Sequence, residues 1–129
     1  MNAKCSVLLV DDDKFLLEMY QKKFVQSGAT VDIAVGSEEA LNKLQDGSKP
    51  DIILLDIIMP TMDGIELLSA IRQQKLVPEA HIIMLTNESD PERIKQAQAL
   101  GISGYIIKAT KIPSEVVEEA FKIAKINTA

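Results

Sequence analysis

The sequence predicts an α/β fold in which one parallel β-sheet is covered by helices on both faces. Two observations support this fold class. Five short apolar segments recur along the 129 residues, and each is followed by a segment with apolar residues at helical spacing. No repeat, low-complexity tract or linker-like run interrupts this alternation. We therefore expect a single domain over residues 1–129.

The five apolar segments differ in their pattern of apolar and polar residues, and the differences predict their order in the sheet. The first, third and fourth are almost continuously apolar, as expected for strands covered on both faces. The second alternates apolar and polar residues, and the fifth is short and contains Gly104, so both suit sheet edges. Right-handed crossovers then give the doubly wound, flavodoxin-like strand order 2-1-3-4-5 with five helices. The segments are residues 5–10, 30–35, 51–56, 81–86 and 103–108.

The intervening segments carry residues that start helices. Four helices are expected to begin after a capping side chain, and Pro113 opens the fifth. The fourth helix has a thin apolar face of Ile94, Ala97 and Leu100, so we expect it to be the most mobile. The expected caps are Asp13, Ser37, Asp63, which can form a capping box with Glu66, and Asp90 before Pro91.

Charge and cysteine content exclude several functional classes. The net charge of −5 disfavours direct binding to nucleic acid or to an anionic membrane surface. No apolar stretch reaches the roughly 20 residues of a membrane span, and no signal peptide opens the chain. Cys5 is the only cysteine and His81 the only histidine, so neither a disulfide nor a zinc site is expected. These features predict a cytoplasmic protein without membrane insertion.

Polar residues end four of the five predicted strands. Asp11 and Asp12 follow the first strand, Asp56 the third, Thr86 the fourth and Lys108 the fifth. In open parallel sheets, ligands bind beyond the carboxyl ends of the strands where the strand order reverses, here between strands one and three. Carboxylates suit Mg²⁺, and a cation, a lysine and a hydroxyl can stabilise a phosphoryl group passing to a carboxylate.

With these residues at the strand ends, the sequence resembles the receiver domains of two-component response regulators, the CheY-like superfamily. The resemblance covers essentially the whole chain. Its most specific part is the central motif, in which an Asp ends an apolar strand and is followed by Met59-Pro60 and Asp63-Gly64. The matching segments, each on its expected strand, are LLVDDDKF, DIILLDIIMPTMDGIELL, IIMLT and GYIIKA.

The resemblance implies a phosphoacceptor site rather than an enzyme, since such a domain catalyses only its own phosphorylation and dephosphorylation. Asp56 would take a phosphoryl group from a phosphohistidine on a sensor histidine kinase or phosphotransfer protein. Mg²⁺ or Mn²⁺ would be held by Asp12, Asp56 and the backbone carbonyl of Ile58, with Asp11 acting mainly through water. Lys108 and Thr86 would contact phosphoryl oxygens. Asp13 falls outside the matched acids and is interpreted as a helix cap.

The resemblance also implies a switch. Tyr105 matches the aromatic residue that turns inward when Thr86 moves toward the phosphoryl group, changing the face of the fourth helix, fifth strand and fifth helix. An edge-strand tyrosine that only packs is the alternative. The switched face would control an unknown output protein or effector domain, and phosphorylation-dependent dimerisation is compatible with the family. Whether the chain is a complete regulator or part of a longer one stays open.

Three residues depart from the family pattern. Ala109 follows Lys108 where a proline is usual, so the peptide bond between them is expected to be trans unless the site imposes strain. Asn87 is bulkier than the usual residue after the threonine, and Ile58 is apolar where many relatives have a polar side chain. Both predict hindered water attack and slow loss of phosphate, although Glu88 could oppose this by orienting water.

Three alternative functions match parts of the sequence pattern. A phosphohydrolase with an Asp-x-Asp nucleophile would use Asp11 and Asp13, but Phe15 stands where that motif wants Thr or Val, and no second acidic pair follows. A flavin carrier would need a phosphate-binding first loop, which three carboxylates would repel. The strongest alternative is a receiver-like interaction module that does not use phosphorylation.

Overall fold

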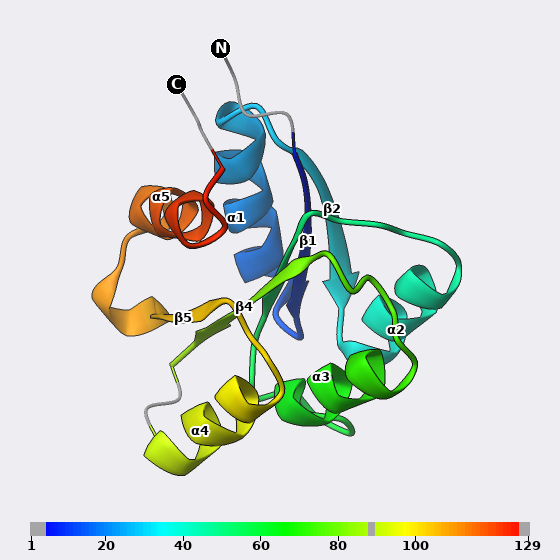
Figure 1. Cartoon of the computed structure of the whole chain (residues 1–129). Coiled ribbons are helices and arrows are strands. Elements are labelled where there is room, and N and C mark those ends of the chain that lie inside the picture. Colours follow the sequence, from blue (N-terminus) through cyan, green and yellow to red (C-terminus); the bar gives the residue numbers. More distant parts are fainter. Residues whose placement is uncertain (1–4, 88–89, 127–129) are drawn as a thin grey trace.

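The computed structural model describes residues 5–87 and 90–126 (Figure 1). One sheet holds five parallel strands in the order β2-β1-β3-β4-β5, which confirms the predicted topology. The strands are β1 (Ser6–Asp11), β2 (Thr30–Val35), β3 (Ile52–Leu55), β4 (His81–Thr86) and β5 (Gly104–Ile107). The helices are α1 (Lys14–Gln26), α2 (Ser37–Gln45), α3 (Gly64–Gln73), α4 (Pro91–Ala99) and α5 (Pro113–Ile123), with a 3₁₀ turn at Lys108–Thr110.

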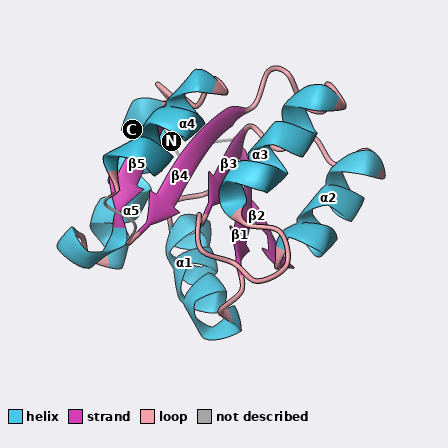
Figure 2. Ribbon diagram, turned by 90° about the horizontal axis from the view of Figure 1, so that it is seen from below, coloured by secondary structure: helices cyan, strands magenta, loops and turns pink. Residues whose placement is uncertain are grey.

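Helices cover both faces of the sheet, as the apolar central strands require. α1 and α5 lie on one face, and α2, α3 and α4 lie on the other (Figure 2). Successive residues of β1 and β3 alternate between two buried clusters, so that Leu9 and Leu54 pack under α1 and α5. Leu8 and Ile53 pack instead under α2 and α3. The sheet is therefore packed against helices on both faces.

The two edge strands behave as predicted, with one local difference. β2 is half exposed along most of its length, in keeping with an edge position. The expected alternation of inward apolar and outward polar residues fails at its end, where Ala34 is buried and Val35 is 41% exposed. β5 occupies the other edge and leaves Tyr105 exposed.

Most predicted helix starts are confirmed. The carboxylates of Asp13 and Asp90 accept hydrogen bonds from the first turns of α1 and α4. Asp63 and Glu66 form the full capping box of α3. Pro113 is the first residue of α5.

The predicted cap at Ser37 is wrong by one residue. Gly36 is the N-cap of α2, with a φ of 93°, a left-handed conformation that glycine adopts without steric cost. Ser37 is therefore the first residue inside the helix. Its hydroxyl donates instead to the carbonyl oxygen of Met62 at 2.6 Å.

The surroundings of Cys5 and His81 and the Lys108–Ala109 peptide bond are also defined. Cys5 is buried at the entrance of β1, and the pKa of its thiol is raised by burial and by the charge of Asp51. His81 contacts the hydroxyl of Ser103 at 3.0 Å. The peptide bond between Lys108 and Ala109 is trans. Among the described helices, none is both long and apolar enough to cross a bilayer.

Candidate functional site

Three carboxylates meet at the carboxyl end of the sheet. β1 and β3 are hydrogen-bonded neighbours, so Asp11 at the end of β1 and Asp56 just after β3 leave the sheet side by side. One carboxylate oxygen from each of Asp11, Asp12 and Asp56 lies within 4.8 Å of the others. The predicted grouping at the reversal point is therefore confirmed. Clustered hard oxygen ligands of this kind fit Mg²⁺, which prefers a few carboxylates and keeps several waters.

Lys108 brings a positive charge into this group from the far edge of the sheet. It follows β5 directly, and its Nζ donates to Asp11 Oδ2 at 2.7 Å and to Asp56 Oδ2 at 3.3 Å. All three side chains are about a tenth exposed or less. One ammonium against three carboxylates leaves the pocket net negative, so a divalent cation would relieve the remaining repulsion.

Burial and charge shift the pKa values of this group. Burial raises the pKa of Asp56, and the nearby charge of Lys108 opposes that rise without cancelling it. Burial by itself would lower the pKa of Lys108, but the hydrogen bond that its ammonium donates to Asp11 and the charge of Asp56 raise it overall. Lys108 therefore stays protonated, and protons compete with a metal ion for Asp56.

The three consecutive acids have different surroundings. Asp11 is buried, with Oδ1 accepting from the backbone N–H of Asp13 at 3.1 Å and Oδ2 bound to Lys108. Asp12 is exposed, and desolvation and a hydrogen bond with Asp11 raise its pKa. Asp13 caps α1 through a 3.2 Å hydrogen bond from Leu16 N–H. The structure thus separates Asp13 from the carboxylate cluster, as predicted.

Thr86 and Tyr105 lie on the neighbouring strands β4 and β5. Thr86 ends β4, between β3 and β5, and is fully buried. Tyr105 lies opposite Met84 in the register of β5 and is 41% exposed. The rim residue Ile58 is 57% exposed, and Asn87 is exposed as well. Glu88 lies outside the described residues.

The loop after Asp56 is held tightly. A Cβ on Gly64 would overlap the backbone carbonyl oxygen of Asp56, so no larger residue fits there without a shift. The N–H of Gly64 donates to the carbonyl of Ile57 at 2.8 Å. The hydroxyl of Ser37 fixes Met62 from α2. Sequence reasoning missed this contact, because nothing local marks a pair of residues 25 positions apart.

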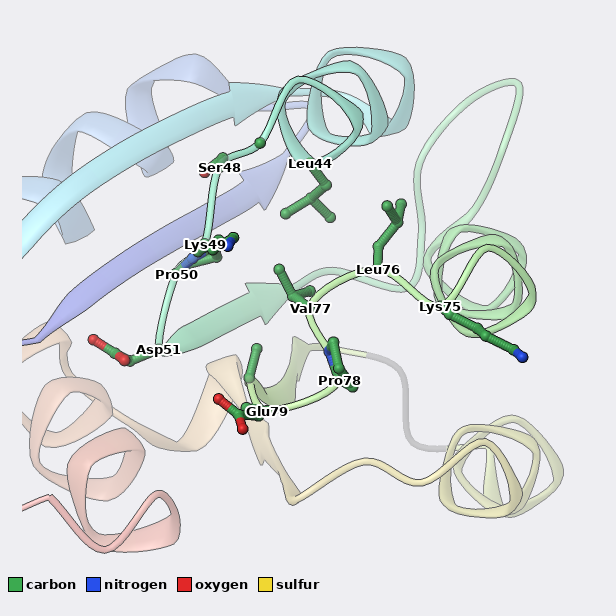
Figure 3. A pocket seen from close by; sticks show the side chains of 12 residues that line it. Leu44, Ser48, Lys49, Pro50, Asp51, Lys75, Leu76, Val77, Pro78 and Glu79 are labelled. Atoms are coloured by element: carbon green, nitrogen blue, oxygen red, sulfur yellow. The ribbon is translucent and has the colours of Figure 1, made fainter.

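A cavity of about 550 Å³ lies at the opposite, amino end of the sheet (Figure 3). Leu44, Leu76 and Val77 point into it, whereas Lys75 and Asp51 point away from its centre. Asp51 instead accepts a hydrogen bond from the backbone N–H of Ser6 at 2.9 Å. The charged side chains around this cavity do not converge on a common point.

A family model for the response regulator receiver domain matches residues 7–120. The chain belongs to this family. As a receiver domain, it is a phosphoacceptor signalling module rather than a true enzyme, and the predicted resemblance is confirmed. Its acidic pocket of Asp11, Asp12 and Asp56 is typical of the Mg²⁺ site of receivers.

Individual relatives support the same family. The receiver is 36% identical to the chemotaxis protein CheY of Halobacterium salinarum over 108 residues, which cover 84% of this chain and 88% of that protein. It is 38% identical to the alkaline phosphatase synthesis transcriptional regulatory protein PhoP of Bacillus subtilis, covering 84% of this chain but 43% of PhoP. The structure of CheY4 from Vibrio cholerae matches with a TM-score of 0.84 and 31% identity, over 94% of this chain and 99% of that one.

The geometry also bears on the phosphohydrolase alternative. That mechanism requires Asp11 and Asp13 to face the same substrate. Asp13 instead caps α1 and is not among the clustered carboxylates of the described residues. The receiver assignment accounts for the acids that do converge.

Proposed function

We propose that this receiver accepts a phosphoryl group on the Asp56 carboxylate from a phosphohistidine of a sensor histidine kinase or phosphotransfer protein. The observation that carries this proposal is the position of Asp56. It is a buried carboxylate 3.3 Å from the Lys108 ammonium, with two further carboxylates within 4.8 Å. An Asp56 oxygen forms the new P–O bond as the P–N bond to the donor imidazole breaks.

The remaining pocket residues have separate roles. Asp12, Asp56 and the backbone carbonyl of Ile58 would hold Mg²⁺ or Mn²⁺, which when bound neutralises charge on the phosphoryl oxygens. Asp11 would act on the metal through water, a role supported by its two oxygens already accepting hydrogen bonds. Lys108 moves from Asp56 to a phosphoryl oxygen, because its ammonium already lies within hydrogen-bond distance of the acceptor.

The same site would control an output surface. Thr86 donates its hydroxyl to a phosphoryl oxygen, and Tyr105 then turns into the space that opens beside β4. The ring starts from a half-exposed position at an edge strand, so its inward rotation would alter the face of α4, β5 and α5. An output protein, effector domain or second copy would read that face. Exposed Ile58 and Asn87 at the rim would slow hydrolysis of the phosphate.

Intact mass after incubation with Mg²⁺ and a small phosphodonor tests the acceptor. Wild type is expected to gain one phosphate, and Asp56→Asn none. Asp51→Asn is a matched control, because it removes the same charge at the opposite end of the sheet. An adduct that persists in Asp56→Asn places the acceptor elsewhere. A folded wild type without any adduct supports an interaction module that does not use phosphorylation.

A further inference from the structure

Helix α4 is attached to the rest of the molecule differently from the other helices. Each of the other four buries at least three residues, whereas α4 buries Ala97 alone. The predicted thin apolar face is thus confirmed. α4 packs chiefly against α3. With little apolar area to hold it, its position depends on polar contacts at its two ends.

The first contact joins the N-terminal end of α4 to the start of α3. Arg93 Nη2 donates to Asp63 Oδ2 at 2.7 Å. The other oxygen of this carboxylate, Oδ1, accepts from the backbone N–H of Glu66 at 2.9 Å and caps α3. One carboxylate therefore serves both helices, and each oxygen has its own donor.

The Arg93 side chain is incompletely hydrogen-bonded in this contact. The Nε of Arg93 is buried without a hydrogen-bond partner. Burying an unpaired donor costs free energy, which offsets part of what the ion pair contributes. The Arg93 and Asp63 side chains also remain 31% and 23% exposed, so solvent screens their attraction. Both features make the contact easy to open.

The second contact holds the C-terminal end of α4. Arg72 on α3 donates from Nε to the carbonyl of Leu100 and from Nη2 to the carbonyl of Gly101, both at 2.8 Å. A guanidinium at the negative end of a helix dipole satisfies carbonyls that the helix leaves unpaired. This two-point contact is the firmer of the two.

The anchors of α4 differ in how they connect to the phosphoacceptor pocket. Asp63 ends the loop fixed by Ser37 and Gly64, so it stays with Asp56. The N-terminal end of α4 follows Thr86 after residues 87–90. If Thr86 shifts toward Asp56, as the proposed function requires, it would pull on the end of α4 that carries Arg93, whereas the Arg72 contact lies at the other end of the helix.

We propose that Arg93 and Asp63 form a latch that holds α4 in its resting position, and that the Arg72 contact is the hinge about which α4 turns when the latch opens. The latch itself depends only on these contacts. Its coupling to Asp56 rests on the proposed function. Because coupling is reciprocal, opening the latch also favours the phosphorylated state.

Hydrogen exchange of the metal-free, unphosphorylated full chain tests the latch. Arg93→Gln is expected to speed exchange of α4 amides about fivefold, the effect of losing about 1 kcal/mol, while leaving α3 unchanged. Lys95→Gln is the matched control, because it removes one positive charge from an exposed position on the same helix. Equal exchange in the two variants overturns the latch, as does faster exchange throughout the molecule.

Asp63→Asn provides a second test. Asparagine keeps the capping oxygen of α3 but replaces the oxygen that binds Arg93. The variant should match Arg93→Gln in α4 exchange, and the double variant should show no further rise. Additive effects of the two substitutions overturn the latch, because independent residues add.

Binding of beryllofluoride with Mg²⁺, which mimics a phosphoryl group, tests the coupling. Arg93→Gln is expected to bind it about fivefold more tightly than wild type, and Lys95→Gln equally to wild type. Unchanged affinity in Arg93→Gln overturns the coupling. If wild type itself does not bind the mimic, the proposed function fails, and the exchange measurements still decide on the latch.

Discussion

The end of the sheet at which the strands finish, the carboxyl edge, differs from the opposite end, the amino edge, in the side chains that its loops bring together. At the carboxyl edge, where the strands end, three carboxylates and Lys108 converge within hydrogen-bond or metal-ligand distance. At the amino edge, formed by the segments 46–51 and 74–80 that precede β3 and β4, a cavity of about 550 Å³ is bordered by charged side chains that diverge. The convergence of charge, and not the volume of the cavity, identifies the functional site.

Topology accounts for this difference. The chain leaves β1 and β3 toward opposite faces of the sheet, which opens a crevice between their carboxyl ends. Polar side chains placed there face a common space. At the amino edge, Leu44 and Val77 line the cavity, and the Asp51 carboxylate accepts a hydrogen bond from the backbone N–H of the β1 residue Ser6. We expect substitutions at the carboxyl edge to have the larger functional effects.

Matched glycine substitutions give the largest expected effect on stability. Gly64→Ala forces its Cβ against the backbone of Asp56, and overpacking against backbone should cost about 3 kcal/mol of unfolding free energy. Gly47→Ala at the amino edge has open space around the new Cβ but a φ of 103°, and should cost about 1 kcal/mol. Urea unfolding measures both. A larger loss from Gly47→Ala would contradict the tighter packing assigned to the carboxyl edge.

Matched acid substitutions compare the edges in metal binding. Asp12→Ala removes an exposed carboxylate of the cluster and should weaken Mg²⁺ binding by about 10- to 100-fold. Asp51→Ala removes the same charge at the amino edge and should leave the affinity within about twofold, since long-range charge effects are screened. Titration calorimetry gives both dissociation constants. Similar losses in the two variants would mean that net charge, rather than ligand geometry, governs affinity.

Mg²⁺ affinity should depend on pH through Asp56. Burial raises the pKa of this carboxyl, so the folded protein holds its proton at pH values where the unfolded chain has lost it. The contribution of this carboxyl to the free energy of unfolding is therefore fully present below the ordinary Asp pKa of about 3.9. It is lost as pH rises through the raised pKa of Asp56 in the folded protein. Mg²⁺ must displace that proton, so affinity should rise with pH in this window by up to about tenfold per unit. Calorimetry across the window would refute this if affinity stayed constant.

Local signals and strand polarity explain how much could be predicted from the sequence. The pattern of apolar and polar residues in each strand predicted the sheet order. The caps at Asp13 and Asp63 could be predicted because they depend on residues within one helical turn. The grouping of Asp11 with Asp56 followed from a general rule about parallel strands. Each of these inferences uses information that lies within a few residues or in the fold class.

Contacts between distant side chains could not be predicted in the same way. Ser37 reaches Met62 and Arg93 reaches Asp63 across 25 and 30 residues. These pairs depend on helix orientation and on the length of each side chain, which no local pattern records. The N-cap of α2 shows how sensitive such contacts are to position. It lies at Gly36, one residue before the predicted Ser37, and the Ser37 hydroxyl therefore binds the loop at Met62 instead of capping its own helix.

The smallest expected effect lies within the acidic run itself. Asp13 neighbours a proposed metal ligand in sequence, yet its carboxylate accepts from Leu16 N–H and caps α1. Asp13→Ala should therefore cost about 1 kcal/mol of unfolding free energy and leave Mg²⁺ affinity nearly unchanged. Asp13→Asn should restore most of the stability, because an asparagine side chain caps equally well. A loss of Mg²⁺ affinity in Asp13→Ala as large as in Asp12→Ala would show that the summed negative charge of the carboxyl edge attracts the metal. The two edges would then differ in electrostatic potential rather than in the positions of individual ligand atoms.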